Sequence, residues 1–269
     1  MAVGKGAAIV SKTKQSIDFL ILTASYQRGD LLLKIIEKLT NDAHEHGLVC
    51  THVIVDDCSP ADPFYAQIEE LSNEQDSYQV IYRRNQKNNG RAAFWQTMNS
   101  LWSFTKELSG KYKYVIQIAD DLMPCDDFLG RASRMFDELK TQDPSICAMN
   151  TQCTLLRNWE TTRYIDGAYI ADERFFAALN YEMESTDITI WHDNPLRGSG
   201  TGFQITTRMM GQDAVKIAPC QDVAFCQPIV CPSVMFPKDI RPQIWWRDNY
   251  IDRGEESVMN TMIDRGDSE

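Results

Sequence analysis

Two pairs of adjacent acids follow apolar, β-branched runs in this sequence, and each pair could hold a cation. Asp56 and Asp57 follow one run, and Asp120 and Asp121 end the run that begins at Tyr114. Two carboxylates at one strand end repel each other unless a cation or a proton lies between them. Mg²⁺ is commonly held by one or two carboxylates together with substrate phosphates. The second pair therefore predicts a site for a divalent cation and a diphosphate; helix capping or simple solvation is the alternative.

Polar segments also follow two other apolar runs, at 18–24 and 78–82. The first is a turn that ends at Arg28, and the second is a basic loop that begins at Arg83. The carboxyl ends of parallel strands meet at one edge of an open α/β sheet, where such folds bind ligands. There a carboxylate can accept a hydrogen bond from a base, and Arg can neutralise phosphate oxygens. The segments together indicate a nucleoside diphosphate.

The glycine-rich phosphate motifs are absent from the chain. The first turn reads Ser-Tyr-Gln-Arg-Gly rather than GxGxxG, and there is no phosphate loop ending in Gly-Lys-Ser or Gly-Lys-Thr. Phosphate binding is therefore expected to depend on a metal and on side chains. A nucleotidyltransferase, which would need a glycine-rich loop near the first strand, is disfavoured.

The elements that would position these acids alternate regularly along the chain. Apolar runs at 18–24, 51–55, 78–82, 114–118 and 145–149 predict strands, and amphipathic segments between them predict helices. Asp30 is expected to cap the first helix, and Asp126 or Asp127 the helix after the fourth strand. Strict alternation predicts an α/β fold with a mostly parallel central sheet flanked by helices on both faces.

The alternation is lost beyond residue 150, where a smaller mixed region with short strands such as 202–206 is expected. The predicted organisation is a loose lead-in over 1–16, a nucleotide-sugar half over 17–150, an acceptor and catalytic half over 151–251, and a polar tail over 252–269. The two halves are expected to belong to one domain.

Composition restricts the function further. The chain has 269 residues, 43% of them hydrophobic, and a formal net charge of −11, which argues against a large basic surface for nucleic acid. Eight cysteines without a CxxC pair disfavour zinc and favour reduced thiols in the cytoplasm; a disulfide among Cys220, Cys226 and Cys231 is the alternative. No apolar stretch approaches the ~20 residues of a membrane span, so stable membrane insertion is not expected. The sequence does not determine the oligomeric state.

Four ordered motifs resemble those of GT-A fold (Rossmann-like) nucleotide-sugar glycosyltransferases, most like glycosyltransferase family 2. They are the opening strand and turn at 19–28, Val-Ile-Val-Asp-Asp-Cys-Ser at 53–59, the Asn-to-Gly loop at 85–90, and Ala-Asp-Asp with a following Pro at 119–124. The resemblance covers residues 18 to 130. The first acid of the family's DxDD pattern falls on Ile118, and its Ala-Arg-Asn falls on 94–96, so Arg84 or Arg91 would make the basic contact.

The resemblance implies roles for individual residues. Asp56 would bind the pyrimidine ring, with Asp57 as second choice, and Asp120 and Asp121 would hold Mn²⁺ or Mg²⁺ on the diphosphate. The full implied nucleotide-sugar set is Thr23, Ser25, Tyr26, Arg28, Asp56, Asp57, Arg84, Asn85, Gly90, Arg91 and Asp120.

The acceptor half is expected to supply a general base, because an acceptor alcohol is a poor nucleophile until its proton is withdrawn. Asp222, in a segment similar to the family's Glu-Asp motif, is the first candidate, and Asp193 is the second. Residues 198–203 look like a glycine-rich acceptor strand, with a flexible loop as the alternative.

The predicted activity is a metal-dependent, inverting hexosyl or pentosyl transfer from a nucleoside diphosphate sugar, with a UDP-sugar favoured. The acceptor would be a saccharide hydroxyl or a hydroxymethylated DNA base. The alternative is a non-catalytic nucleotide-sugar-binding module with a degenerate metal motif.

Overall fold

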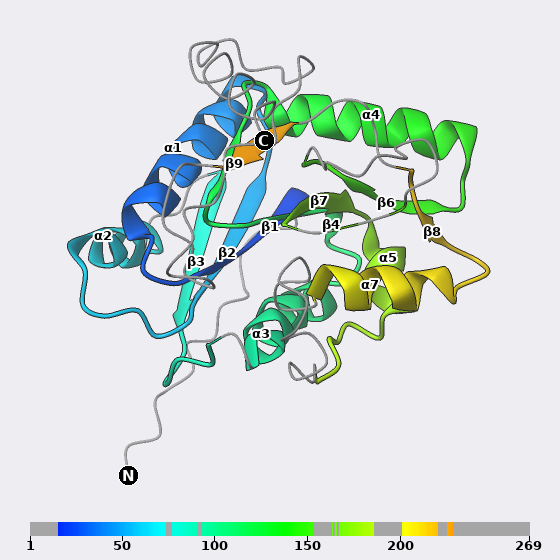
Figure 1. The fold of residues 1–269 in the computed structure, drawn as a ribbon. Helices are drawn as coiled ribbons and strands as arrows, with labels where there is room; N and C mark the ends of the chain where they lie inside the picture. Colours follow the sequence, from blue (N-terminus) through cyan, green and yellow to red (C-terminus); the bar gives the residue numbers. More distant parts are fainter. Residues whose placement is uncertain are drawn as a thin grey trace, which may run out of the picture.

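The computed structural model describes residues 16–73, 77–90, 93–152, 163, 165, 167–185, 201–219 and 225–228. In this part of the chain, one large sheet has the strand order β3-β2-β1-β4-β7-β6-β8 (Figure 1). Its strands are β1 (Ile17–Ser25), β2 (Cys50–Asp56), β3 (Tyr78–Arg84), β4 (Tyr112–Ile118), β6 (Ile146–Asn150), β7 (Ala168–Ala171) and β8 (Lys216–Ile217). A second sheet pairs β5 (Leu122–Pro124) with β9 (Cys226–Pro228).

The sheet is mostly parallel, as the alternating pattern predicts. β1 pairs in parallel with β2 and β4, and β2 pairs in parallel with β3. β7 is the exception, because it lies between β4 and β6 and runs antiparallel to both. Residues beyond 150 therefore extend the same sheet through β7 and β8.

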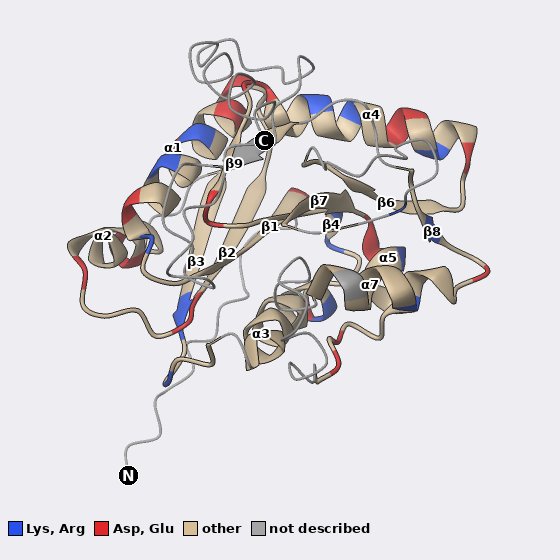
Figure 2. Cartoon of the chain, in the orientation of Figure 1, with Lys and Arg blue, Asp and Glu red and all other residues tan. Residues whose placement is uncertain are grey.

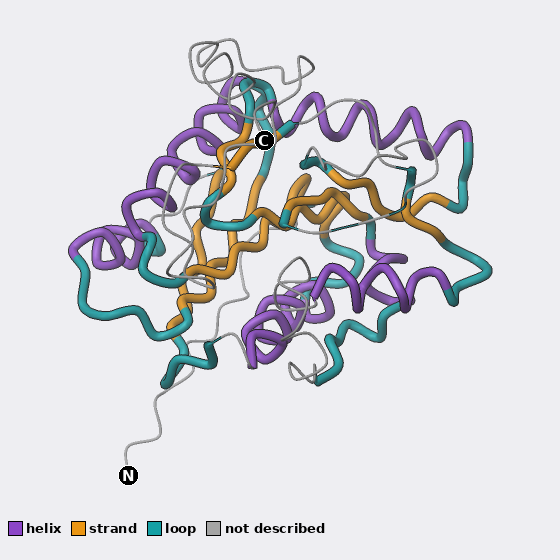
Figure 3. Tube along the Cα trace, in the orientation of Figure 1, coloured by secondary structure: helices purple, strands orange, loops and turns teal. Residues whose placement is uncertain are grey.

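Helices cover both faces of the sheet, as Figure 3 shows. They are α1 (Gly29–Glu45), α2 (Pro63–Leu71), α3 (Phe94–Glu107), α4 (Phe128–Gln142), α5 (Glu173–Ala178) and α7 (Thr201–Met210). One core cluster joins α1, α2 and α4 to the sheet, and the other joins α3, α5 and α7 to it. Phe19 and Ile21 of β1 pack in the first cluster, and Leu20 and Leu22 pack in the second. This alternation follows the two-residue period of a strand buried on both faces.

Two local predictions were wrong, and a third was right only in position. Residues 202–206 lie in α7 rather than in a strand, because Ile205 and Met209, four residues apart, share the face that packs into the core. Asp30 is the second residue of α1 and not its cap, since Arg28 occupies the N-cap position. Asp127 does occupy the N-cap position of α4, but its side chain makes no capping hydrogen bond.

Cys50, Cys58 and Cys147 are free thiols. Burial raises the pKa of the Cys50 and Cys147 thiols to about 12, which keeps them protonated and unreactive. The alternative disulfide stays a prediction, because Cys220 and Cys231 lie outside the described residues. None of the helices in the described part is both long and apolar enough to span a bilayer.

Candidate active site

The strand register brings the predicted polar residues to one edge of the sheet. Ser25, Asp56 and Arg84 are direct neighbours across β1, β2 and β3. β4 lies on the other side of β1, so the residues that follow Ile118 reach the same edge. This is the carboxyl edge of the parallel strands, where open α/β sheets bind their ligands.

Arg28 lies between the two acids that follow β4. Its Nη1 is 2.9 Å from Oδ1 of Asp120 and 2.8 Å from Oδ2 of Asp121. The backbone N–H of Tyr26 also donates to Oδ2 of Asp120 at 3.1 Å. All three charged residues are buried, with 8% of Arg28, 6% of Asp120 and 1% of Asp121 exposed. The turn after β1 thus supplies a cation to the acid pair.

Burial controls the ionisation of Asp120. Loss of solvation raises the pKa of this carboxyl, and repulsion from Asp121 adds to the rise. The guanidinium of Arg28 acts in the opposite direction without cancelling the effect of burial. Asp120 and Asp121 are therefore short of positive charge even with Arg28 present, which is the condition that favours a divalent cation.

The two acids at the end of β2 turn to opposite faces of the sheet. Asp56 lies on the side of α2, where Oδ1 accepts from the N–H and the hydroxyl of Ser59 at 2.9 and 2.6 Å. Its Oδ2 accepts from the Tyr82 hydroxyl at 2.9 Å, and Nε of Arg84 is 3.5 Å away. Asp56 has no exposed surface. Direct contact with a base would therefore require these donors to move.

Asp57 lies on the α3 side and organises the loop that follows β3. Its oxygens accept from the backbone N–H of Asn89 and Gly90 at 3.1 and 3.0 Å. The side chains of Asn85 and Thr97 donate at 2.8 and 3.0 Å. Gly90 has φ of +59°, a conformation that costs glycine little and other residues more. The loop shape therefore depends on both the acid and the glycine.

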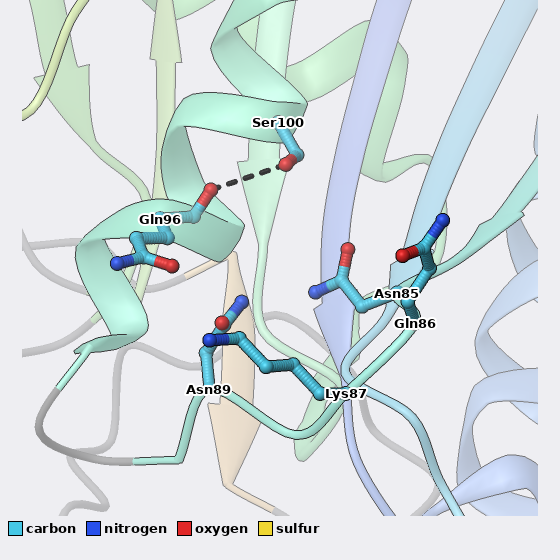
Figure 4. Close-up of a pocket in the computed structure, with 6 residues that line it drawn as sticks. All are labelled: Asn85, Gln86, Lys87, Asn89, Gln96 and Ser100. Atoms are coloured by element: carbon cyan, nitrogen blue, oxygen red, sulfur yellow. Dashed lines mark hydrogen bonds between the residues drawn. The ribbon is translucent and has the colours of Figure 1, made fainter.

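A cavity of about 440 Å³ lies beside this loop. Its lining comes from the loop and from the first turns of α3 (Figure 4): Asn85, Gln86, Lys87, Asn89, Gln96 and Ser100. The Ser100 hydroxyl donates to the backbone carbonyl of Gln96, so part of the wall is fixed within the helix. The lining is amide, hydroxyl and ammonium, which suits a polar ring and its ribose more than an apolar ligand.

The residues of the first turn have different surroundings. Tyr26 is half-buried at the edge, and Ser25 is buried with its hydroxyl 2.7 Å from that of Tyr65. Thr23 is fully buried, and its hydroxyl bonds to His52 Nε2 at 2.9 Å inside the sheet. The structure therefore brings Ser25, Tyr26 and Arg28 to the edge but leaves Thr23 in the interior.

Several participants were not expected from the sequence. Tyr65, Tyr82 and Thr97 hold Ser25, Asp56 and Asp57 respectively, yet each is an ordinary helix or strand residue in the sequence. Ser59 was detectable, because a serine three residues after an aspartate can close a local turn on it. The predicted residues Arg91, Asp193 and Asp222 lie outside the described residues.

The described residues form an α/β domain of the doubly wound type with a polar carboxyl edge. The chain belongs to glycosyl transferase family 2, whose model matches residues 20–181. This confirms the family and the α/β class that the motifs indicate, and it places the chain among glycosyltransferases. No curated protein matches the chain in sequence.

Solved structures share the fold at low identity. TarS of S. aureus in complex with UDP is 12% identical with a TM-score of 0.55, over 80% of this chain and 61% of that one. The mannosyltransferase PcManGT of Pyrobaculum calidifontis, in complex with GDP-Man and Mn²⁺, is 15% identical with a TM-score of 0.54, over 82% and 61%. A longer TarS structure is covered over only 38% of its length. The chain thus spans less than two thirds of these proteins.

Proposed function

We propose that this protein transfers a sugar from a nucleoside diphosphate sugar to an acceptor hydroxyl. The observation that carries the proposal is the buried pair Asp120 and Asp121 at the carboxyl edge of the sheet, held together by Arg28. A departing diphosphate develops negative charge, and a buried cationic site at that point stabilises it. Family membership and the shared fold support the same chemistry.

The donor would lie along the edge from β3 to β4. The cavity beside the loop after β3 is the place for the base and ribose, and the acid pair after β4 is the place for the diphosphate. Three strand spacings separate these strands, about 14 Å in all. An extended nucleoside diphosphate fits this separation. We favour a UDP-sugar, consistent with the bound UDP in one structural neighbour; the other holds GDP-Man.

Asp120 and Asp121 would hold Mn²⁺ or Mg²⁺, which when bound supplies positive charge to the leaving diphosphate. The residues fit such an ion, because both are hard oxygen ligands and are brought together in a buried position. Nη1 of Arg28 contacts both carboxylates. A bound ion would therefore require the guanidinium to turn away or to remain as a further partner of the two acids. Once released, its guanidinium would be placed to bind phosphate oxygens.

The acceptor side of the proposal depends on residues 151–251, with residues 17–150 as the donor half. Asp222 would withdraw the acceptor proton, with Asp193 as the second candidate, and a single in-line displacement would invert the anomeric carbon. A saccharide hydroxyl is the favoured acceptor over a hydroxymethylated DNA base, because the net charge is −11. The free thiols of Cys50, Cys58 and Cys147 support the cytoplasm as its compartment.

One observation favours a second function, a nucleotide-sugar-binding module without catalysis. Arg28 already places a positive charge between Asp120 and Asp121, and position 118 is Ile where the family pattern has an acid. A site neutralised in this way could bind a nucleotide without needing a metal.

Turnover of a UDP-sugar separates the two functions. Release of UDP is measured with Mn²⁺ for the full chain, for Asp120→Asn and for Asp126→Asn, whose side chain is 75% exposed and pairs with Lys38. The proposal predicts that Asp120→Asn loses at least about 100-fold in rate, while Asp126→Asn does not change. Nucleotide binding without turnover, with and without saccharide acceptors, would favour the binding module.

A further inference from the structure

We propose a second divalent-cation site, for a zinc-like ion, formed by Asp42, His46 and Asp127. Asp42 and His46 are one turn apart near the end of α1, and Asp127 immediately precedes α4. Acidic segments gather where the end of α1 meets the beginning of α4 (Figure 2). One ligand atom from each of the three residues lies within 4.8 Å of the others.

The distances match a shared ion. Nε2 of His46 is 2.8 Å from Oδ1 of Asp127 and 3.5 Å from Oδ1 of Asp42. Bonds of about 2.0 to 2.1 Å to a tetrahedral zinc place neighbouring ligand atoms roughly 3.3 Å apart. The two observed distances lie on either side of that value, so small side-chain movements would complete three ligands. Water would provide the fourth.

Two carboxylate oxygens of this cluster accept no hydrogen bond from the described residues. Oδ1 of Asp42 and Oδ1 of Asp127 are both buried and accept no hydrogen bond. Asp42 is only 6% exposed, and its other oxygen accepts from the N–H of Leu129 at 2.7 Å. A buried carboxylate oxygen without a donor is costly. Nε2 of His46 is the nearby nitrogen for both oxygens, at 3.5 and 2.8 Å, and an ion between the three atoms would supply the missing partner.

The remaining charges leave that position open. Nη2 of Arg134 is 2.7 Å from Oδ2 of Asp127, and Nε of Arg131 is 3.5 Å from the same oxygen. The Leu129 N–H occupies Oδ2 of Asp42. Each acid thus uses one oxygen for the protein and keeps the other for the ion. These contacts would orient the ligand oxygens.

The ligand types select the ion. An imidazole nitrogen with two carboxylate oxygens suits zinc, and cobalt as its spectroscopic substitute, more than the hard ion Mg²⁺. A zinc ion binds the unprotonated Nε2 of an imidazole, so the affinity of the site should depend on pH. The ion would join the end of α1 to the start of α4 and would fix the segment that leads from the acid pair into α4.

The site is distinct from the acid pair at the sheet edge. α1 begins beside that edge at Gly29, and Asp42 lies about 20 Å further along its axis. Variants at the two sites should therefore act independently.

Zn²⁺ titration of the full chain, after chelator treatment and dialysis, tests the proposal. We expect saturable binding that His46→Gln and Asp127→Asn each weaken by more than about tenfold. Asparagine also tolerates the φ of +54° at position 127, so the second variant keeps the local backbone. His44→Gln is the matched control, because His44 is exposed in the same turn of α1 and outside the cluster. The acid-pair variant Asp120→Asn should bind Zn²⁺ here as the unaltered chain does.

A second measurement does not depend on the variants. In ¹⁵N-detected spectra of the imidazole rings, Zn²⁺ should shift the Nε2 resonance of His46 and leave His44 unchanged. Co²⁺ at the same site should give a visible absorption band that Zn²⁺ removes. The proposal is overturned if no saturable Zn²⁺ binding occurs, or if it is equally tight in His46→Gln and Asp127→Asn. It is also overturned if the His46 ring does not respond to Zn²⁺.

Discussion

In the described part of the chain, two places bring a pair of carboxylates together around one basic side chain, and that side chain differs. At the sheet edge, Arg28 lies between Asp120 and Asp121. At the junction of α1 and α4, His46 lies between Asp42 and Asp127. Arginine stays protonated in proteins and cannot bind a metal, whereas histidine can lose its proton and bind one.

This difference indicates how each pair would accept a metal ion. At the edge, the ion has to replace Arg28, so the guanidinium becomes available to another anion. At the helix junction, the same imidazole would first partner the acids and then serve as a ligand beside them. The two side chains also differ in exposure: that of Arg28 is 9% exposed, and that of His46 is 39% exposed.

Replacing the two cations gives the largest expected contrast. Arg28→Met leaves two buried carboxylates facing each other, and we expect a loss of about 3 to 5 kcal/mol in the free energy of unfolding. His46→Met should cost less than about 1 kcal/mol, because the contact of that imidazole with the acids is partly solvated. Urea unfolding at neutral pH without metal measures both. Similar losses in the two variants would remove the distinction between the sites.

Asp57 sharpens the comparison, because this buried acid is held by hydrogen-bond donors from loop and helix. Asp57→Asn replaces an acceptor by an amide that faces the Asn89 and Gly90 N–H groups. We expect a loss of about 2 to 3 kcal/mol and weaker binding of UDP, since the loop beside the cavity depends on these bonds. Calorimetric titration of UDP and urea unfolding check the two effects, and a stable variant with unchanged UDP affinity would contradict them.

His52 shows how a buried imidazole behaves when its ring nitrogens bond to hydroxyl groups. Burial lowers its pKa from 6.5 to about 3, and its ring bonds to Thr23 and Tyr78. The unfolded chain binds a proton below pH 6.5 and the folded chain does not, so this contribution to stability is lost as the pH falls from 6.5 towards 3.

In this pH range, His52 should lower the free energy of unfolding by about 1.4 kcal/mol for each pH unit of acidification. The raised pKa values of Asp42 and Asp120 act in the opposite direction, because the folded state holds those protons more tightly. They are common to both proteins, so the difference between the unaltered chain and His52→Gln isolates the imidazole. Parallel stability curves for the two proteins in this range would show that His52 is not held neutral.

Gly90 provides the smallest effect, at a position without charge. Gly90→Ala keeps the N–H that Asp57 accepts but puts a side chain at φ of +59°, with its Cβ 3.2 Å from the Asn88 side-chain oxygen. We expect a loss of about 1 kcal/mol, measured by thermal unfolding. Gly110→Ala is the matched control, because Gly110 also has positive φ but open space around its Cβ. If Gly110→Ala lost as much stability as Gly90→Ala or more, the contact with Asn88 would add no cost in the loop.

The first half of the fold was readable because its strands are buried on both faces. Such strands appear as continuous apolar runs, and their acids mark the carboxyl ends, as at Asp56 and Asp120. The antiparallel insertion of β7 between β4 and β6 was not readable, since four apolar residues do not specify a neighbour. The strand predicted at 202–206 was wrong for a related reason, because an apolar pattern over five residues fits a strand as well as a helix.

The composition of the site was easier to predict than its pairing. Sequence placed Arg28, Asp120 and Asp121 at one edge, but not the guanidinium between the two carboxylates, because that contact joins residues 92 positions apart. Similarly, Asp127 was expected to cap α4, yet its side chain contacts His46 and Arg134 instead. A capping preference is local, and the tertiary ion pairs outweigh it at this position.

The binding of UDP with and without Mn²⁺ tests the central claim most directly. Calorimetric titration compares the full chain with Asp121→Asn, using Asp126→Asn as the control. Because binding linkage is reciprocal, an ion held by Asp120 and Asp121 on the diphosphate must strengthen UDP binding. We predict at least a tenfold gain (about 1.4 kcal/mol) from Mn²⁺ in the unaltered chain and in the control, and little gain in Asp121→Asn. Equal UDP affinity with and without Mn²⁺ in the unaltered chain would contradict the account.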